Sequence, residues 1–492
     1  MFGKALLMIG SKIVAHAAFL LIGVVLARTL SQTEFGTFNQ VWLVNKSLLF
    51  LFELGLPISV YYFLPRLPDE EKKGFVLQTL LSLVLFSIPF SAALYFLATP
   101  LAVSFNNPAL ADHLKIFAFY PLVMLPSVST EEILLSLGYV NGAALFESLS
   151  KIVMVSAVAV AAIWGQSLDL VFKSLIVYGI LQSLLGVWLV WQPVKHLKLK
   201  FSLAQWRSQL AYAAPYGFST LTGALNYQVD KVMVSLFNPP GVFAIYAAGA
   251  FEIPLGGVTS LPVVSVMMSD LTQMYAEGNI KGFLAMWHES MRKLALPVLA
   301  VTTFLMVFAE PVVTGLFSAK YAASVWPFRI YLLFSPIRIT VFDYILASLG
   351  KTQMVLKAQA IAMVANVVLG FVLLQTFGWT GAAVSAVLAT YLFIGLLLNK
   401  IRERLGVSWL RVMPWRDLAL VGLVAIAAAL ASLPILWLSI GGLWQLMLGF
   451  VVYSTIYLLG NLMTKAITIA EIKTALAMGR TKIKSLLSTA KK

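Results

Sequence analysis

Several charged side chains of this sequence lie inside stretches that are otherwise apolar. Four basic residues lie within such stretches: Lys12, Lys46, Lys231 and Arg338. A charge that faced lipid at the centre of a bilayer would cost roughly 2.5–3.5 kcal/mol. We therefore expect these side chains to line a water-filled cavity or to enter a network of ion pairs. His16 shares a helical face with Lys12 at spacing i, i+4, and it joins the same set of cavity candidates.

Acidic residues occur in the same apolar stretches. Glu53, Asp230, Glu252 and Asp343 are candidates for handling a coupled proton or sodium ion. A further three carboxylates have simpler interpretations: Glu131 and Glu132 are near the end of their stretch, and Glu147 can pair with Lys151 at spacing i, i+4.

Other kinds of chemistry are excluded or disfavoured by the composition. The chain contains no Cys, which excludes disulfides, thiolate metal sites and cysteine catalysis. Its four His residues are scattered, so we expect no metal site and no other cofactor. It has no Gly-rich phosphate loop followed by Lys and Ser or Thr, so we expect no nucleotide hydrolysis. The sequence therefore predicts no catalytic residues and no enzyme.

The elements that must position these charges are membrane-spanning helices. Of the 492 residues, 60% are hydrophobic and only 11% are charged, far from the composition of a soluble globular domain or a disordered chain. A membrane-spanning helix needs ~20 mostly apolar residues. Fourteen stretches meet this requirement: 5–28, 38–63, 75–98, 113–137, 143–165, 170–191, 207–236, 242–270, 293–317, 326–349, 355–377, 380–399, 416–436 and 441–461.

The segments between these stretches alternate in basic content. If the N-terminus is cytoplasmic, the inner segments and the C-terminal tail hold 25 Lys and Arg residues, and the outer segments hold only Arg28, Lys115 and Lys320. The positive-inside rule then places both termini in the cytoplasm. The net charge of +15 is accounted for by this orientation and by contact with anionic lipid headgroups, so we expect no nucleic-acid partner.

The chain contains an internal repeat. The tripeptide Ser-Leu-Gly ends at Gly138 and again at Gly350, an offset of 212, and three other short matches, at residues 30–38, 105 and 165, recur in the same order at nearly the same offset. Six spans separate equivalent positions, so the repeat is parallel. We predict an N-terminal lobe, a C-terminal lobe, two added spans and a cytoplasmic amphipathic basic tail, at residues 1–200, 201–400, 401–462 and 463–492.

Three short motifs carry a resemblance to a known family. The stretch from Leu26 to Phe38, LARTLSQTEFGTF, resembles the ARxLxxxEFGxF element of oligosaccharide flippases. The stretch from Asp230 to Ala248 is similar to their element at spans 7 and 8, and the turn around Ser348 to Lys351 resembles another. The chain is thus identified as resembling the polysaccharide-transporter branch of the multidrug/oligosaccharidyl-lipid/polysaccharide exporter superfamily.

This resemblance implies a fold and a function. The fold is an all-α, polytopic membrane protein like the multidrug extruders of the superfamily, with two six-helix lobes and, here, two extra C-terminal helices. The function is a flippase that moves undecaprenyl-diphosphate-linked oligosaccharide, the repeat unit of O-antigen, capsule or exopolysaccharide, between leaflets by alternating access. The location is the bacterial cytoplasmic (inner) membrane. Expected partners are the lipid-linked glycan, membrane lipids and the polysaccharide polymerase or chain-length machinery.

Two other functions stay open at this stage. A multidrug or cation antiporter of the same superfamily would need acidic groups without surplus Lys, so the basic cavity candidates favour the flippase. A non-transporting scaffold of a polysaccharide-synthesis complex has less need of paired charges at membrane depth. Because a diphosphate is an anion, Lys and Arg in a cavity would offset its desolvation.

The charge pattern yields a testable topology. Reporter fusions at residues 238–240 and 320–323 should report the outer side, and fusions at 195–200 and 403–408 should report the cytoplasm. Paired alkaline phosphatase and green fluorescent protein fusions measure this directly. A fusion that reports the opposite side would refute the predicted orientation.

Overall fold

The computed structural model describes residues 2–253, 260–350 and 352–468. These residues form helices, and the described ranges contain no strand. An all-helical chain is the physical consequence of the apolar composition, because a helix satisfies its own backbone hydrogen bonds where lipid offers none.

The chain divides into two compact units. Unit 1 comprises Met1–Phe251, Leu316–Tyr331 and Leu356–Phe393, and unit 2 comprises Glu252–Gly315, Leu332–Val355 and Ile394–Lys492. The lobe boundaries that the repeat predicts, at residues 200 and 400, stay predictions. The predicted tail 463–492 has described residues only to Thr468, and residues 469–492 lie outside the described part of the chain.

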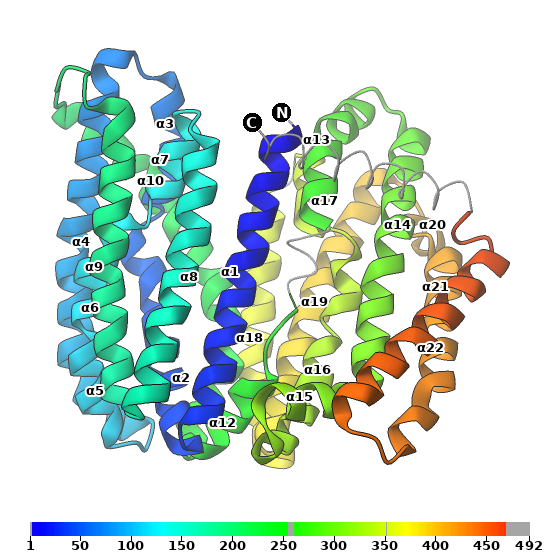
Figure 1. Cartoon of the computed structure of the whole chain (residues 1–492). Coiled ribbons are helices and arrows are strands. Elements are labelled where there is room, and N and C mark those ends of the chain that lie inside the picture. Colours follow the sequence, from blue (N-terminus) through cyan, green and yellow to red (C-terminus); the bar gives the residue numbers. More distant parts are fainter. Residues whose placement is uncertain (1, 254–259, 351, 469–492) are drawn as a thin grey trace, which may run out of the picture. The chain divides into compact units, whose positions relative to one another are not determined.

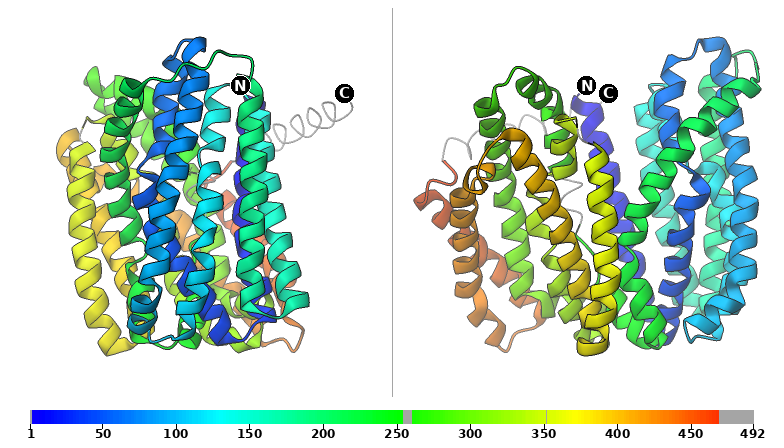
Figure 2. Two further views of the ribbon diagram at one scale, coloured as in Figure 1. Left: turned by 90° about the vertical axis from the view of Figure 1, so that its left-hand side faces the viewer. Right: turned by 180° about the vertical axis from the view of Figure 1, so that it is seen from behind.

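Unit 1 is built mostly from the N-terminal half of the chain (Figures 1 and 2). Its helices are α1 (Phe2–Thr29), α2 (Gln32–Glu53), α3 (Leu56–Phe63), α4 (Asp69–Ser104), α5 (Ala109–Phe117), α6 (Phe119–Met124), α7 (Thr130–Ser136), α8 (Val140–Gly165), α9 (Leu168–Val194), α10 (Leu203–Asn226), α11 (Val229–Phe237), α12 (Pro240–Gly249), α16 (Val325–Leu332), α18 (Thr352–Phe377) and most of α19 (Trp379–Leu405). Helix α8 packs between α1 and α9 along its length.

Unit 2 contains the remaining helices. They are α13 (Leu261–Ala276), α14 (Ile280–Val307), α15 (Ala309–Phe317), α17 (Phe342–Ser348), the end of α19, α20 (Trp409–Val412), α21 (Trp415–Ser432) and α22 (Gly442–Met463). Helix α14 packs against α21, and α21 packs against α22, as the green and orange ribbons of Figure 1 show.

The described residues contain 11 helices that are long and apolar enough to cross a membrane, or 12 if the broken pair Ala319–Leu332 and Ser335–Ser348 is one span. The protein is therefore a multi-pass membrane protein, and twelve of the fourteen predicted spans have a counterpart. The other two, 207–236 and 242–270, fall on α10–α11 and on α12–α13. Helix α10 begins with a polar run that includes Gln205, Arg207 and Gln209. The count of fourteen stays a prediction.

Exposed apolar side chains agree with a lipid environment. Phe96 is 76% exposed, Trp164 83% and Trp437 82%. A soluble monomer rarely leaves large contiguous apolar areas in water, so these side chains are expected to contact lipid tails and headgroups.

Several predicted spans are broken inside the membrane. The predicted span 38–63 is two helices, α2 and α3, because Leu54 (φ 47°) and Gly55 (φ 70°) adopt left-handed backbone conformations. Gly217 of α10 packs directly on this break, since a Cβ atom there would lie 2.6 Å from the Leu54 carbonyl carbon. Close helix approach through Gly is a usual way to cover exposed backbone at membrane depth.

Within unit 1, loops that the charge pattern assigns to the same side of the membrane contact each other. Arg28 donates a 2.7 Å hydrogen bond to the Leu316 carbonyl, and Lys320 donates one of 2.8 Å to the Leu30 carbonyl. Between two loops that the charge pattern assigns to the cytoplasmic side, Lys73 donates a 2.8 Å hydrogen bond to the Lys195 carbonyl. The side of the membrane that each end faces stays a prediction.

Helices α2 and α12 approach most closely at Gly36. A Cβ atom at Gly36 would lie 1.9 Å from the backbone oxygen of Pro240, a distance that no relaxed structure tolerates. We expect Gly36→Ala to push the two helices apart and to reduce the free energy of unfolding by about 1–3 kcal/mol. The melting temperature of the purified protein in detergent measures this.

The matched control is Gly241→Ala on the facing helix α12. A Cβ atom there would meet its nearest neighbour, the Thr33 hydroxyl, at an ordinary 3.8 Å. Gly241→Ala should melt like the parent protein. Equal melting temperatures for the two variants would contradict the close-approach argument.

Candidate functional site

A buried polar cluster in unit 1 surrounds Asp230, in the first turn of α11. The Asp230 side chain is 1% exposed. The Tyr246 hydroxyl of α12 donates a 2.5 Å hydrogen bond to its Oδ2 atom, and the Tyr331 hydroxyl of α16 donates to the same oxygen. A carboxylate buried among apolar helices must be neutralised or hydrogen-bonded, and here two phenols and a nearby ammonium meet that need.

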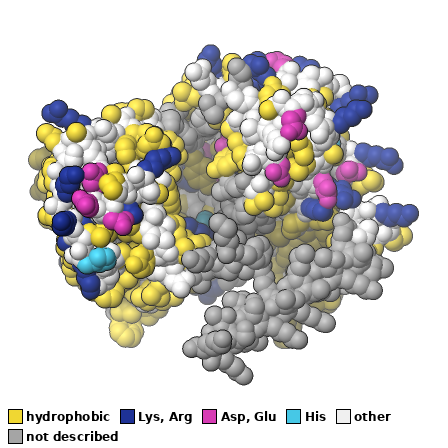
Figure 3. Space-filling model, turned by 90° about the horizontal axis from the view of Figure 1, so that it is seen from above, with side chains coloured by type: hydrophobic (Ala, Val, Ile, Leu, Met, Phe, Trp, Pro, Cys, Tyr) yellow, Lys and Arg dark blue, Asp and Glu magenta, His cyan; other side chains and the backbone are white. Residues whose placement is uncertain are grey.

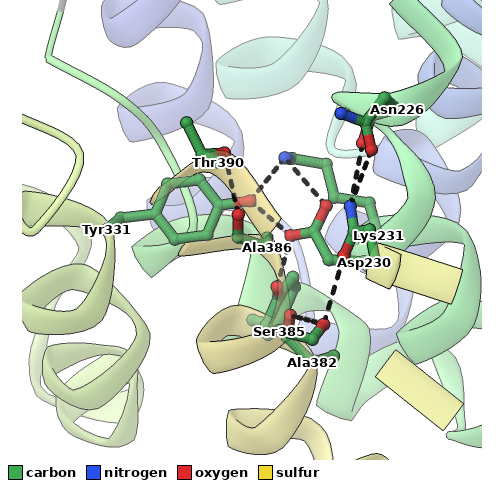
Figure 4. A network of polar contacts seen from close by, with 10 residues as sticks. Asn226, Asp230, Lys231, Tyr331, Ala382, Ser385, Ala386 and Thr390 are labelled. Atoms are coloured by element: carbon green, nitrogen blue, oxygen red, sulfur yellow. Dashed lines mark hydrogen bonds and ion pairs between the residues drawn. The ribbon is translucent and has the colours of Figure 1, made fainter. Parts of the chain in front are cut away.

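The nearby ammonium belongs to Lys231 (Figure 4). Its Nζ atom lies 3.7 Å from Asp230 Oδ1 and donates a 2.7 Å hydrogen bond to the Tyr331 hydroxyl. It also lies over the rings of Tyr227 and Tyr331, 4.7 and 4.9 Å from their centroids. The ammonium is thus held by one carboxylate, one hydroxyl and two aromatic faces.

An amide and hydroxyl chain adjoins this cluster. In Figure 4, Asn226 lies beside Asp230 and Lys231, with Ser385 of α19 below them. The Asn366 amide of α18 donates to the Asn226 side chain at 3.1 Å, and the Ser385 hydroxyl donates to Asn366 Oδ1 at 3.3 Å. These bonds link α10, α18 and α19 in the interior of unit 1, where unpaired amides would be costly.

Lys46 of α2 has a different environment. Its Nζ atom lies 4.3 Å from the centroid of the Phe19 ring, and its charge is close enough to that of Lys231 for the two to repel each other. Among the described residues, Lys46 has no hydrogen-bond or ion-pair partner. Lys46 and Lys231 therefore create a region of positive potential in unit 1, and the single negative charge of Asp230 offsets only part of it.

A second charged cluster in unit 1 contains Lys12. Its Nζ atom donates to Glu131 Oε2 at 2.6 Å and lies 3.7 Å from Glu147 Oε1. Glu132 is close to this group, and its Oε2 atom is buried without a hydrogen-bond partner in the described part of the chain. Lys12 remains 46% exposed, so it is partly accessible despite its pairing.

Two of the candidate charges in unit 2 pair with each other. Arg338 Nε donates to Glu252 Oε1 at 2.6 Å, and its NH2 group donates to Glu252 Oε2 at 2.9 Å. Neither residue is in an α-helix: Arg338 lies in a short 3₁₀ segment (Ser335–Ile339), and Glu252 follows the end of α12. The Ser260 hydroxyl donates to the Arg338 carbonyl, which helps to satisfy the non-helical backbone.

The structure brings some of the sequence-predicted residues together and separates others. Asp230 and Lys231 share one cluster, and Glu252 and Arg338 form one ion pair. Within the described ranges, His16 hydrogen-bonds only to the Lys12 carbonyl, through Nδ1 at 2.7 Å. That the four basic residues line one cavity stays a prediction.

The two remaining acidic candidates have few contacts. Glu53 is half-buried at the end of α2 and, within the described ranges, has neither an ion-pair nor a hydrogen-bond partner; its charge lies near that of Glu132. Asp343 is half-buried in the first turn of α17, where the positive end of the helix dipole favours a carboxylate.

Sequence reasoning missed several members of these clusters. Tyr246 and Tyr331 supply the hydroxyls on Asp230, although Tyr246 lies inside the motif that begins at Asp230. The expected pairing of Glu147 with Lys151 is absent in the described residues, because Glu147 faces Lys12 of another helix. Spacing along one helix cannot reveal such contacts between helices.

No group of three or more His, Cys, Asp or Glu side chains that could hold a metal ion occurs among the described residues.

The chain is similar to known membrane transporters. A family model described as "Polysaccharide biosynthesis protein" matches residues 3–261, and no curated protein matches the sequence. Among solved structures, the lipid II flippase MurJ in an inward closed conformation is 14% identical with a TM-score of 0.72, and the alignment covers 94% of this chain and 99% of that one.

Two further structures share the fold at the same low identity. An inward-facing multidrug-resistance MATE transporter of the MOP superfamily is 14% identical with a TM-score of 0.66, covering 80% of this chain and 94% of that one. A MOP superfamily transporter from Pyrococcus furiosus, noted for the reverse polarity of its binding pocket, is 14% identical with a TM-score of 0.53, covering 82% and 95%. The expected fold and the resemblance to this superfamily are confirmed.

The hydrogen bonds to Asp230 can be tested by stability. Tyr246→Phe removes one hydroxyl donor from a buried carboxylate, so we expect it to reduce the free energy of unfolding by roughly 1–3 kcal/mol. Thermal unfolding of the purified protein, followed by circular dichroism, measures the change.

Tyr321→Phe is the matched control. Tyr321 is also fully buried, but its hydroxyl has no hydrogen-bond partner in the described part of the chain. Its removal should leave stability unchanged or slightly higher. If both Phe variants unfold at the parent temperature, the hydrogen bonds to Asp230 do not stabilise the fold.

Proposed function

Because the chain belongs to the polysaccharide biosynthesis protein family, we propose that it is a flippase that moves a polyprenyl-diphosphate-linked oligosaccharide from the inner to the outer leaflet by alternating access. The cargo on this proposal is the repeat unit of an O-antigen, capsule or exopolysaccharide. MurJ, whose fold the chain shares, is itself a flippase of a lipid, lipid II.

The observation that carries this proposal is the excess of positive charge in the apolar part of unit 1. Lys46 has no carboxylate partner among the described residues, and its charge lies near that of Lys231. Two ammonium groups at membrane depth cost free energy unless an anion or water offsets them. A dianionic diphosphate is such an anion, and it cannot cross hydrocarbon unaided.

The geometry of the Asp230 cluster would allow the Lys231 ammonium to leave Asp230 for an anionic ligand. The carboxylate lies 3.7 Å from the ammonium, a long distance for an ion pair, while two phenols already hydrogen-bond to Asp230. A phosphate oxygen could take the ammonium from Asp230 without leaving that carboxylate bare. We propose that Lys231 and Lys46 contact the diphosphate, with Lys12, His16 and Arg338 as further members of the pathway.

Transport without chemistry fits the described side chains. Three carboxylates near the pathway, Asp230, Glu131 and Glu252, are held by Tyr, Lys or Arg partners, which suits binding better than acid–base catalysis. We therefore propose that the protein is a transporter and not an enzyme, with no cofactor. Glu53, Asp230, Glu252 and Asp343 remain our candidates for coupling to a proton or sodium gradient.

The remaining parts of the proposal concern location. We propose the bacterial inner membrane, with both termini cytoplasmic, because of the distribution of Lys and Arg between loops. Polysaccharide polymerase or chain-length machinery would receive the product on the outer side.

A multidrug or cation antiporter is the second candidate. Glu53 favours it, because this half-buried carboxylate has no partner in the described residues and could meet a cationic drug. The shared fold with a multidrug-resistance MATE transporter is compatible with either function.

The experiment is glycan export in a strain that depends on this gene. We expect Lys46→Ala to reduce export at least about tenfold, the effect of roughly 1.4 kcal/mol, and Lys46→Arg to retain most of it, because charge matters more than shape at a diphosphate. Surface polysaccharide and the lipid-linked glycan that accumulates inside are both measured, and membrane abundance is checked for each variant.

Lys173→Ala is the matched control, since this lysine is exposed on α9 and has no partner in the described ranges. It should export normally. Lys12→Glu should be worse than Lys12→Gln, because it would place another carboxylate beside Glu131, Glu132 and Glu147. Normal export by Lys46→Ala, Lys231→Ala, Lys12→Glu and Arg338→Ala at normal abundance would refute the electrostatic mechanism and favour the multidrug extruder.

A further inference from the structure

Unit 2 contains a cavity that the proposed transport does not use. Its volume is about 680 Å³, and its wall includes Lys281, Arg411 and Arg416 together with the apolar side chains of Leu284 and Met413. This volume is in the range of clefts that bind small molecules, and most of its wall residues are exposed, so the cavity is open on one side.

The cavity lies where two membrane helices begin. Lys281 is in the first turn of α14, Arg416 is in the first turn of α21, and α14 and α21 pack side by side. Both helices are long and apolar enough to cross a membrane. The cavity is therefore at a membrane–water boundary, whichever side of the membrane that boundary faces.

The charge of the cavity is unbalanced. Among the described residues, Lys281, Arg411 and Arg416 make no hydrogen bond or ion pair through their side chains, whereas Asp417 is the only carboxylate in the wall. Other basic side chains of unit 2 do pair, for example Lys400 with Glu403 at 2.7 Å. Figure 3 shows Lys and Arg side chains, with Asp and Glu side chains among them, on the surface at this end of the unit.

Two features of the backbone add to the positive potential. Helix α21 begins after Pro414 without a side-chain hydrogen bond to its first amides. The first turns of α14 and α21 both contribute residues to the wall, so the positive ends of these two helix dipoles lie beside the cavity and favour an anion there.

The surroundings of the cavity are apolar as well as basic. Leu410 is 85% exposed, Trp415 44% and Trp409, just beside the cavity, 46%. Trp at a membrane interface contacts both headgroups and the upper part of acyl chains. A free phosphate would use the cations but not these side chains, whereas a phospholipid would use both.

We propose that this cavity binds the headgroup phosphate of an anionic glycerophospholipid, with Lys281, Arg411 and Arg416 on the phosphate and Leu410 and Trp415 against the acyl chains. The site is separate from the charged clusters around Asp230 and Glu252, and the inference stands whether or not the chain flips a glycan. Binding at the start of α14 and α21 would hold these two helices at the membrane surface.

Native mass spectrometry of the full-length protein in detergent tests this. The protein is titrated with phosphatidylglycerol and with phosphatidylcholine of the same acyl chains. We expect tighter binding of phosphatidylglycerol, and an affinity at least about tenfold lower in the triple variant Lys281→Gln/Arg411→Gln/Arg416→Gln, since each basic residue near an anionic lipid contributes roughly fivefold. The control triple is Lys198→Gln/Arg404→Gln/Lys465→Gln, whose lysines and arginine are exposed and without partners in the described residues; it should bind as the parent does.

The variant Asp417→Asn serves as a control for misfolding, because the proposal predicts that it gains affinity for phosphatidylglycerol, whereas a misfolded protein would lose it. The substitution removes the only carboxylate of the wall, so binding of phosphatidylglycerol should become about fivefold tighter. Unchanged binding in both the basic triple variant and Asp417→Asn would overturn the proposal. Displacement of the lipid by millimolar inorganic phosphate, or equal affinity for phosphatidylcholine, would also overturn it, because the site would then be a phosphate site or a general lipid contact.

Discussion

The structure depends on one constraint: inside a membrane, no water is present to satisfy polar groups. Every backbone amide must find its partner within the protein, which makes the described residues helical. The same constraint acts on side chains. Asp230 has two tyrosine hydroxyls, and Glu252 has both arms of the Arg338 guanidinium. The partners come from segments that are distant in the sequence, so the packing of the chain and the neutralisation of charge are one problem.

Several of the candidate charges lie where helices break. Glu53 ends α2 just before the left-handed residues Leu54 and Gly55. Glu252 and Arg338 lie in non-helical segments, and Asp343 begins α17. A break frees backbone amides and carbonyls, and protein interiors or water-filled cavities are the only surroundings that tolerate them at this depth. In transporters of this general architecture such breaks commonly adjoin the binding site.

The charged groups differ in how tightly they are held. The guanidinium of Arg338 is fixed by two hydrogen bonds to one carboxylate, and Lys12 is fixed by one short hydrogen bond to Glu131. In the part of the chain that the structure describes, the only partner of the Lys46 ammonium is the aromatic ring of Phe19. A cation with no anion beside it is the one with the most to gain from an anionic cargo, which is why the proposal rests on Lys46 more than on the paired residues.

The sequence by itself determined the fold class and most of the membrane-spanning segments, because the length of an apolar stretch is a local property that decides whether a helix can cross a bilayer. Its short motifs also pointed to the family of polysaccharide transporters. The sequence assigned Asp230 and Lys231 to different roles, although they are adjacent, because neighbouring side chains of a helix point in different directions. Only the tertiary structure decided their partners: Tyr246 and Tyr331 lie 16 and 101 residues from Asp230 along the chain. It also redirected Glu147 from Lys151 on its own helix to Lys12 on α1. The reason is that pairing strength depends on distance in space and on exclusion of water, and spacing along one helix specifies neither of these.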